Sequence, residues 1–346
     1  MQYPGGLGTT RGFGAAGDVG HVESYFLKLN DPDGRRALWL KATILARRGG
    51  DVIADAWAIA FDRGRSHVAV KDSVPLRPEQ SARAGEAQPE DARFGPRGLD
   101  AHVCKLHLYP GRVMGSVGDG ERTISFDLRF TMDAPPLIPF PSERMYATRL
   151  PSSKLVSPHP DSRFTGTYTA NGETVDVNGW RGMQGHNWGT RHAELYAWCH
   201  VNQWQGGADL MFEGLTARVK VGPVLAPPLT LLCVWHRGVH YHFNDPITLL
   251  RARGNIDPID APRRWRFHAK NALAEVSGEM FADTSDFVGL SYENPDGAIT
   301  YCLNSKIARG RLRLSVKGRP DLDVVTNAAA FEIGTKNAQH GVKMLA

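Results

Sequence analysis

The stretch from Met183 to Trp204, MQGHNWGTRHAELYAWCHVNQW, concentrates side chains that are suited to ligand binding and proton transfer. Three histidines, three tryptophans and two asparagines occur within these 22 residues. Imidazole groups transfer protons or bind metal ions, whereas indole rings and amides line apolar pockets and orient ligands there. The stretch is therefore compatible with a buried structural corner, a metal site or the wall of a pocket.

The second half of this stretch is predicted to be a β-strand with two unlike faces. Side chains alternate between the faces of a strand, so the small and mostly apolar residues Ala197, Cys199, Val201 and Gln203 share one face. An aromatic opposite face with a histidine and an amide suits a ligand cavity, and a filled core with locally bonded indole N–H groups is the alternative. The residues of that opposite face are Tyr196, Trp198, His200, Asn202 and Trp204.

Two glycines, Gly185 and Gly189, flank His186, Asn187 and Trp188 in the first half of the stretch. Glycine allows the backbone to turn sharply or to approach another chain segment closely, so the pattern predicts a strand end or a bulge. Such a turn would direct His186 and Trp188 into one shared space. In the alternative interpretation, His186 and Asn187 only bridge backbone groups at this corner.

Acid–base chemistry has its best carboxylate candidate in Glu213, which apolar residues flank in DLMFEGL. Burial would raise the pKa of this carboxyl and keep it protonated, as a general acid requires. A salt bridge from Glu213 to Arg218 or Arg191 on a solvated face is the alternative. The sequence does not choose between Glu213, His200 and His186 as the acid, and three weaker candidates are Glu194, Asp209 and Asp176.

Other kinds of site find little support. His240 and His242 have the His-x-His spacing of some zinc sites, but no HExxH motif or acidic loop accompanies them. Gly6 and Gly8 are followed by Arg11 where a dinucleotide fingerprint has glycine, and the nucleophile motif GxSxG is absent. We therefore expect no cofactor and no bound metal.

Composition narrows the class of protein further. The 346 residues are 42% hydrophobic, which supports a real core, and 41 basic residues against 36 acidic ones are spread along the chain. No basic arm is present, so a nucleic-acid partner is not expected. No apolar run of about 18 residues and no signal-peptide pattern occur, which predicts a cytoplasmic protein without a transmembrane segment. The four separated cysteines are expected to be free thiols.

Short β-rich segments divided by turns fill most of the chain, among them RALWLKATILARR and DVIADAWAIAFDR. The Ala170-Asn171-Gly172-Glu173 sequence predicts a two-residue hairpin, because Asn-Gly tolerates positive φ angles. About eight candidate strands lie on each side of residue 185, which suits two small barrels or sandwiches. The Pro-rich segment 133–142 is predicted to be a surface connection, and residues 75–100 a mobile loop that can serve as a lid.

The run RFTGTYTANGETVDVNGWRGMQGHNWGTRHAELYAWCHVNQW resembles the central region of the AttH and carotenoid 1,2-hydratase-like family. The specific match is the His-x-Trp-Gly motif at His186 to Gly189. The resemblance implies an all-β fold of two lipocalin-like antiparallel β-barrels packed together, with a hydrophobic small-molecule site near their junction. We expect a flexible leader over residues 1–19, an N-terminal barrel over 20–185 and a C-terminal barrel over 186–346.

The resemblance also implies a function: a cofactor-independent hydratase or cyclase that acts by acid–base catalysis on an isoprenoid- or polyketide-like molecule. A non-catalytic binding protein for a hydrophobic ligand is the alternative. The catalytic candidates are His186, Glu213 and His200. The expected substrate-binding residues are Asn187, Trp188, Tyr196, Trp198, Asn202 and Trp204.

Overall fold

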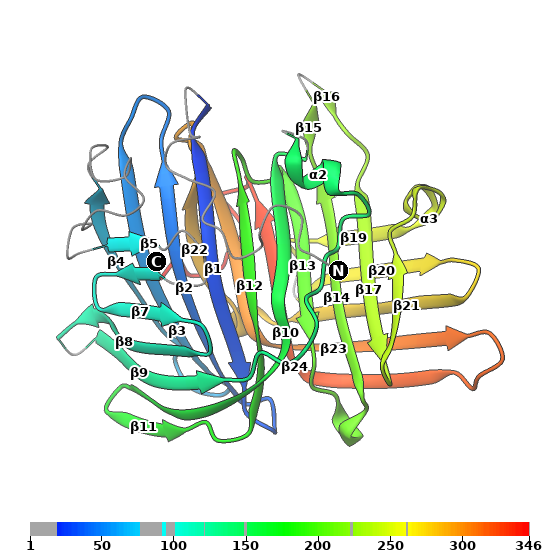
Figure 1. The fold of residues 1–346 in the computed structure, drawn as a ribbon, viewed down its shortest axis with the longest axis horizontal. Coiled ribbons are helices and arrows are strands. Elements are labelled where there is room, and N and C mark those ends of the chain that lie inside the picture. The colour runs from blue at the N-terminus through cyan, green and yellow to red at the C-terminus, as the bar shows by residue number, and fades with distance from the viewer. Residues whose placement is uncertain are drawn as a thin grey trace.

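Two antiparallel β-sheets that lie side by side make up almost all of the structure, a computed structural model (Figure 1). The described residues are 19–76, 92–94, 101–120, 122–148, 151–221, 224–260 and 262–345. Residues 1–18 of the predicted leader and most of the predicted loop at 75–100 lie outside these ranges. No helix among the described residues has the length and apolar character that crossing a membrane would require.

The first sheet has the strand order β4-β3-β2-β1-β12-β10-β9-β8-β7-β6-β5, with β11 paired to β10. Its strands are β1 (His21–Asn30), β2 (Arg36–Ala46), β3 (Val52–Asp62), β4 (Val68–Leu76), β5 (Ala92–Phe94), β6 (Ala101–Val103), β7 (Leu106–Tyr109), β8 (Arg112–Asp119), β9 (Arg122–Phe130), β10 (Ser153–Ala170), β11 (Glu173–Asp176) and β12 (Trp180–Gly189).

The second sheet has the order β18-β17-β14-β13-β24-β23-β21-β20-β19, with β22 paired to β23. Its strands are β13 (Leu195–Val201), β14 (Leu210–Arg218), β17 (Leu229–His236), β18 (Val239–Phe243), β19 (Arg253–Asp257), β20 (Arg263–Lys270), β21 (Ala274–Ala282), β22 (Val288–Glu293), β23 (Ile299–Val316) and β24 (Leu322–Thr335). The remaining elements are β15 (Lys220–Val221), β16 (Val224–Leu225), α2 (Glu143–Ala147), α3 (Pro246–Arg251), η3 (Gln205–Gly207) and η4 (Thr284–Asp286).

The two sheets share one topology. In each, a four-strand meander (β1 to β4, or β13, β14, β17 and β18) pairs through its first strand with the last long strand, β12 or β24. That strand then pairs with an 18-residue strand, β10 or β23, which carries register shifts. Bulges bend a strand, so these two long strands turn each sheet back over itself.

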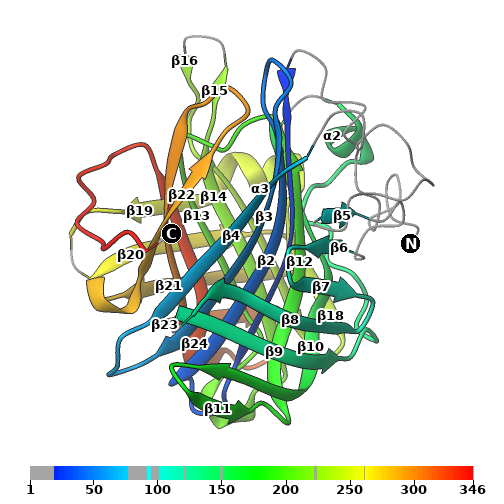
Figure 2. The same cartoon turned by 90° about the vertical axis from the view of Figure 1, so that its left-hand side faces the viewer.

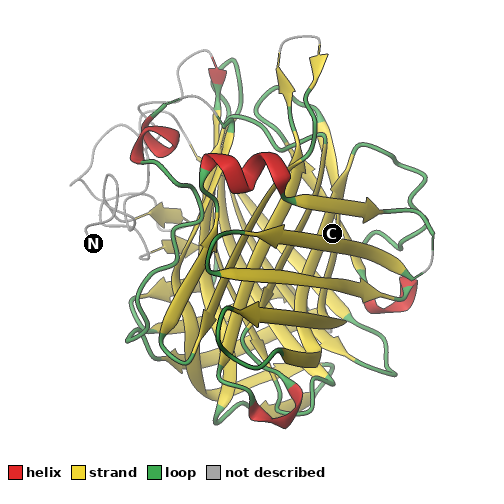
Figure 3. Ribbon diagram, turned by 90° about the vertical axis from the view of Figure 1, so that its right-hand side faces the viewer, coloured by secondary structure: helices red, strands yellow, loops and turns green. Residues whose placement is uncertain are grey.

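Closure follows from that bend. In the first barrel β8 and β9 contact β3 and β4, and Figure 2 shows them crossing in front of the meander. In the second barrel β19 contacts β14 and β17, and Figure 3 shows one set of strands crossing in front of another. This architecture confirms the predicted fold class of two packed lipocalin-like barrels.

Alternation along the meander strands gives each sheet an inner and an outer buried face. Leu38, Leu40 and Ala42 of β2 pack inside the first barrel, whereas Trp39 faces the second barrel. Apolar and polar groups from both barrels therefore meet in a layer between them, which we call the seam. The layer explains why almost every residue of β2 and β3 is buried, a pattern that one-sided strands lack.

Several local predictions are confirmed. Asn171 and Gly172 have φ angles of 50° and 73° and connect β10 to β11, with Ala170 paired to Glu173. The four cysteines are free thiols.

The predicted division between residues 185 and 186 falls inside β12, because the first sheet continues to Gly189.

The Pro-rich connection is not simply a surface segment, which corrects that prediction. Leu137 forms an isolated β-bridge with Ser157 and is fully buried. Phe140 is also buried and packs with Tyr146 and Trp188. Proline keeps the segment out of the sheets, but its apolar side chains fill the space where the barrels meet.

Candidate functional site

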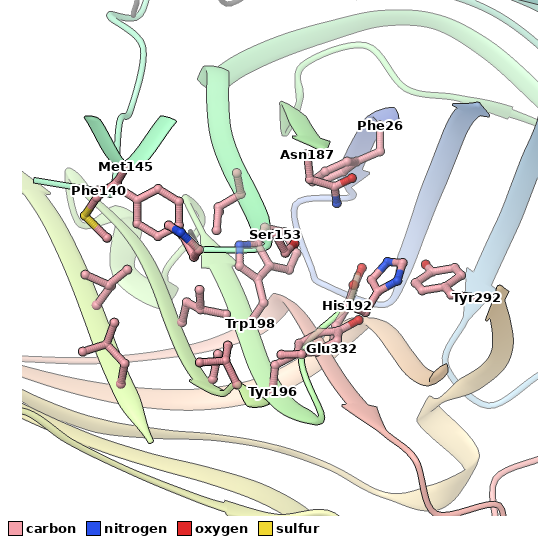
Figure 4. Close-up of a pocket in the computed structure, with 18 of the residues that line it drawn as sticks. Phe26, Phe140, Met145, Ser153, Asn187, His192, Tyr196, Trp198, Tyr292 and Glu332 are labelled. Carbon is pink, nitrogen blue, oxygen red and sulfur yellow. The ribbon is translucent and has the colours of Figure 1, made fainter. Parts of the chain in front are cut away.

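A cavity of about 160 Å³ lies in the seam between the barrels. Strands β1, β2, β10 and β12 of the first sheet and β13, β14, β17, β22 and β24 of the second contribute to its lining, together with α2 (Figure 4). Because both barrels supply walls, the cavity exists only when they are packed together.

One end of the cavity is apolar. Figure 4 shows Phe140 and Met145 at this end, and Leu215 and Leu231 of the second barrel pack in the same apolar cluster. Trp198 meets Phe26 edge to face with ring centroids 5.7 Å apart and forms part of the floor. Such walls favour apolar ligands, because contact with them removes hydrocarbon surface from water.

The other end is polar and is organised around His192, from the connection between β12 and β13 (Figure 4). Asn294 Oδ1 accepts hydrogen bonds from the His192 backbone N–H at 2.8 Å and from His192 Nδ1 at 2.9 Å. The Asn294 amide nitrogen is engaged with Ala298 and Thr300, so its oxygen is the acceptor for the ring. This assigns the proton of His192 to Nδ1 and leaves Nε2 with a lone pair.

Burial lowers the pKa of His192 to about 4, so the imidazole is neutral at pH 7. Two phenols share this end of the cavity, Tyr196 and Tyr292, and burial raises the pKa of both well above the ordinary value. They therefore stay protonated as hydrogen-bond donors. A neutral base and two neutral acids thus line one end of a cavity whose other end is apolar.

Glycines make room for this arrangement. A Cβ atom at Gly334 would come within 1.8 Å of the Tyr196 ring, and one at Gly185 within 2.2 Å of Phe26. The predicted strand end is at Gly189, where β12 stops, whereas Gly185 lies inside β12 in regular register with β1 and leaves room for an aromatic ring of that strand.

Three of the predicted substrate-binding residues line the cavity: Asn187, Tyr196 and Trp198. The predicted alternation along β13 is also observed, since Ala197, Cys199 and Val201 pack in the core of the second barrel.

His200 and Asn202 lie on the same face as Tyr196 and Trp198 but in a filled part of the seam. His200 Nε2 hydrogen-bonds the Pro160 carbonyl at 2.8 Å. The Asn202 amide donates to the Gly182 carbonyl at 2.7 Å and accepts from Lys28 Nζ at 3.1 Å. Both side chains are fully buried and join the barrels, and neither lines the cavity.

The predicted position of Trp204 on the cavity-facing side of the strand is wrong. Strand β13 ends at Val201, so the alternation does not continue to residue 204. The indole packs in the core of the second barrel and donates to the Leu210 carbonyl at 2.8 Å.

His186 and Trp188 lie on the face of β12 opposite Asn187. His186 is fully buried and stacks between Tyr25 and Trp188, with centroid separations of 4.3 and 4.6 Å. Its Nε2 hydrogen-bonds Glu23 Oε1 at 2.8 Å. The two rings do share one space, as predicted, but it is not the cavity of the seam.

Glu213 lies in the seam beside the cavity and does not line it. It makes neither of the predicted salt bridges; Ser157 donates a 2.7 Å hydrogen bond to its Oε2. Burial raises the pKa of this carboxyl to about 7, and the bond from Ser157 offsets the rise only in part. The pKa of Glu213 is thus raised, as predicted, but its carboxyl group does not line the cavity.

This placement predicts how Glu213 affects stability. A carboxyl whose pKa is raised on folding contributes stability below its unfolded pKa, and that contribution is lost as the pH rises through about 7. We expect the wild type to lose about 2 to 3 kcal/mol of unfolding free energy, relative to Glu213→Gln, between pH 5 and 8. Urea titrations at both pH values measure this, with the exposed Glu143→Gln as control. Equal pH dependence of wild type and Glu213→Gln would contradict the assignment.

The remaining candidates lie elsewhere. None of Glu194, Asp209 and Asp176 lines the cavity. His240 stacks on Trp235, and His242 contacts Cys233 at 3.5 Å. Within the described ranges, no group of three or more His, Cys, Asp or Glu side chains is arranged to hold a metal ion.

Sequence reasoning missed five polar groups of the cavity: Lys41, Ser153, His192, Tyr292 and Glu332. His192 stands in a connection, where no periodicity assigns a direction to its side chain. Lys41 did carry a signal, because it is the only charged residue within the apolar run ALWLKATILA.

Comparison with known proteins supports the fold. No family model matches the chain. Two uncharacterized proteins of Mycobacterium tuberculosis, one from strain CDC 1551 and Rv0493c from strain H37Rv, are each 25% identical over 292 residues. The match covers 84% of this chain and 80% of either relative.

Two solved structures share the architecture at low sequence identity. NE1406 of Nitrosomonas europaea, a protein assigned to AttH, has a TM-score of 0.53 and 13% identity, with 91% of this chain and 92% of that chain covered. CghA in complex with Sch210972 has a TM-score of 0.57 and 10% identity, with 92% and 88% covered. The chain has the AttH-like fold of two lipocalin-like barrels, which confirms the resemblance seen in its sequence.

Proposed function

We propose that this protein is a cofactor-independent hydratase or cyclase that acts by acid–base catalysis on a largely apolar small molecule in the seam cavity. The observation that carries the proposal is His192: a neutral imidazole with its tautomer fixed by Asn294, facing a cavity with apolar walls. A structural histidine in a filled core would need no such opening beside it. CghA, which shares the fold, is known in complex with a small molecule.

The roles follow from which atoms face the cavity. In a hydration, His192 Nε2 accepts a proton from water while the water oxygen bonds to one alkene carbon. The other carbon takes up a proton from a hydroxyl donor such as Tyr196. The proton held by His192 then returns to the phenolate oxygen, so the net change is the addition of one water. In a cyclisation, the base removes a proton from the ligand and a donor returns one, so the product is an isomer of the substrate.

The proposal is tested by incubating the protein with a hydrophobic extract and with defined isoprenoid and polyene compounds. Mass spectrometry then identifies molecules that are retained, that gain one water, or that change retention time at constant mass. Conversion supports the enzyme. Retention without conversion supports the carrier and overturns the enzyme, and the absence of both overturns the cavity as a ligand site.

A cavity-filling variant supplies a structural test. Ala217 lies on β14 and lines the cavity, so Ala217→Phe introduces a ring into the space that the ligand would occupy. We expect at least about a tenfold loss of affinity for any retained ligand, since a hydrophobic pocket discriminates by about 1–3 kcal/mol for one extra group. Quenching of tryptophan fluorescence measures binding. The control is Arg218→Phe, which introduces the same ring at an exposed position of β14. Undiminished affinity in Ala217→Phe would place the ligand elsewhere.

A further inference from the structure

We propose that the ligand of the seam cavity carries an anionic oxygen, such as a carboxylate or an acidic enol, which binds the ammonium group of Lys41. This inference rests on the proposed function, because it assumes that the cavity holds the ligand. It adds the chemical class of that ligand: an apolar body with one acidic end.

The first support is the isolation of Lys41. The side chain is only 5% exposed, yet it makes no hydrogen bond or ion pair with any residue that the structure describes. Its Nζ lies 3.9 Å from the centroid of the Tyr292 ring and 5.8 Å from that of Trp39. Ring faces stabilise a cation but cannot accept the hydrogen bonds that an ammonium group donates. A buried ammonium is costly without such acceptors, so a partner from outside the chain is expected.

The second support is that the carboxylates around Lys41 are already paired. Glu332 Oε1 accepts a hydrogen bond from Lys306 Nζ at 2.7 Å. Asp55 pairs with Lys71 at 3.2 Å. Glu293 pairs with Arg47 through two hydrogen bonds of 2.6 and 2.7 Å. The positive charge of Lys41 therefore remains without a counter-ion of its own.

The third support is position. Lys41 lines the seam cavity and also a neighbouring cavity of about 250 Å³, together with His192 and Tyr292. Figure 4 shows His192 and Tyr292 beside Glu332 at this end, with Phe140 and Met145 at the opposite end. A ligand whose acidic end reaches Lys41 would thus lay its apolar body toward Phe140 and hold its reacting atoms near His192.

Titration of Lys41 gives the proposal a signature. Burial lowers the pKa of Lys41 to about 8, so in the empty protein about half of the side chains are neutral at pH 8. A bound anion would raise that pKa, and binding would take up protons at pH 8 but not at pH 6. Among the groups that surround Lys41, burial keeps His192, Tyr292 and Cys302 neutral in this pH range. The neighbouring carboxylates Asp55 and Glu332 are in ion pairs with Lys71 and Lys306.

The test compares geranate with geraniol, which share one isoprenoid body and differ in the anionic group. We expect wild type to bind geranate about 10- to 100-fold more tightly than geraniol, as a hydrogen bond to a buried charge is worth about 1.5–3 kcal/mol. Lys41→Met should abolish this preference, so that the variant binds geranate no more tightly than geraniol. Lys317→Met removes the same charge from an exposed position and should behave as wild type.

Each outcome is decisive. An equal affinity of wild type for the two ligands, or a preference for geranate that survives in Lys41→Met, overturns the Lys41 proposal and leaves the cavity standing. Binding of neither ligand overturns the cavity as well. Calorimetry of the wild type in buffers of different ionisation enthalpy needs no variant: uptake of up to about half a proton per bound geranate at pH 8, and almost none at pH 6, is expected. Equal uptake at both pH values contradicts the proposal.

Discussion

Replacing His192 with glutamine is expected to reduce conversion of the substrate by about 100-fold. The amide can still donate to Asn294, but it cannot accept and hold a proton as Nε2 of the imidazole does. The expected loss lies at the lower end for general base catalysis, because a pKa of about 4 makes His192 a weak base. Initial rates at saturating substrate measure the effect.

The pH profile distinguishes this role from a structural one. The value of kcat/KM should stay constant from neutral pH down to about pH 5 and fall below it, where His192 gains a proton in the empty site. Retention of an unreacted ligand by His192→Gln shows that the cavity is intact. The exposed His268→Gln, which loses only a contact to Glu275, is the matched control. A rate in His192→Gln equal to that of wild type would rule out this residue as the base.

The strands and the tight turn between β10 and β11 were predictable from the sequence because they obey local rules. The Asn171-Gly172 turn follows from backbone sterics, and the unlike faces of β13 follow from strict alternation up to Val201. Alternation does not predict what each face of the strand contacts in the folded protein. Tyr196 and His200 share one face, yet one borders a cavity and the other binds a backbone carbonyl.

The same limit explains the outcome for the histidine motif. His186 and Asn187 are neighbours in the strand, and they serve opposite faces: the interior of the first barrel and the seam. Residues that meet across the seam come from distant parts of the chain, such as Lys41, His192 and Tyr292. A single sequence contains no signal for that contact, since it is set by how two complete barrels pack.

Glu23 is expected to stabilise the first barrel strongly, and His186 contributes to this stability by binding the Glu23 carboxylate. The carboxylate is fully buried and binds His186 at 2.8 Å, His21 at 3.0 Å and the Tyr25 hydroxyl at 3.0 Å. Burial alone would raise the pKa of Glu23, but the hydrogen bonds from His186 and His21 outweigh it and hold the pKa at about 2. A depressed pKa means that the folded state favours the ionised carboxylate.

The sign of the pH effect follows. Stability from Glu23 is fully present above its unfolded pKa of about 4.5 and is lost as the pH falls toward 2. The contribution is about 3 kcal/mol, since one unit of pKa difference corresponds to about 1.4 kcal/mol. We therefore expect Glu23→Gln to lower the unfolding free energy by about 3 kcal/mol at pH 7, and the difference from wild type to shrink as the pH falls from about 4.5 toward 2.

Urea unfolding at pH 7, 4 and 3 measures this, and Glu275→Gln provides the control. Glu275 also pairs with a histidine, His268, but on an exposed surface where the contribution of an ion pair is small. Because Glu23 lies inside the first barrel, ligand binding in the seam should be unaffected by its substitution. If Glu23→Gln instead abolished conversion at unchanged stability, the chemistry would belong to the interior of the first barrel with His186, and the assignment of His192 would fail.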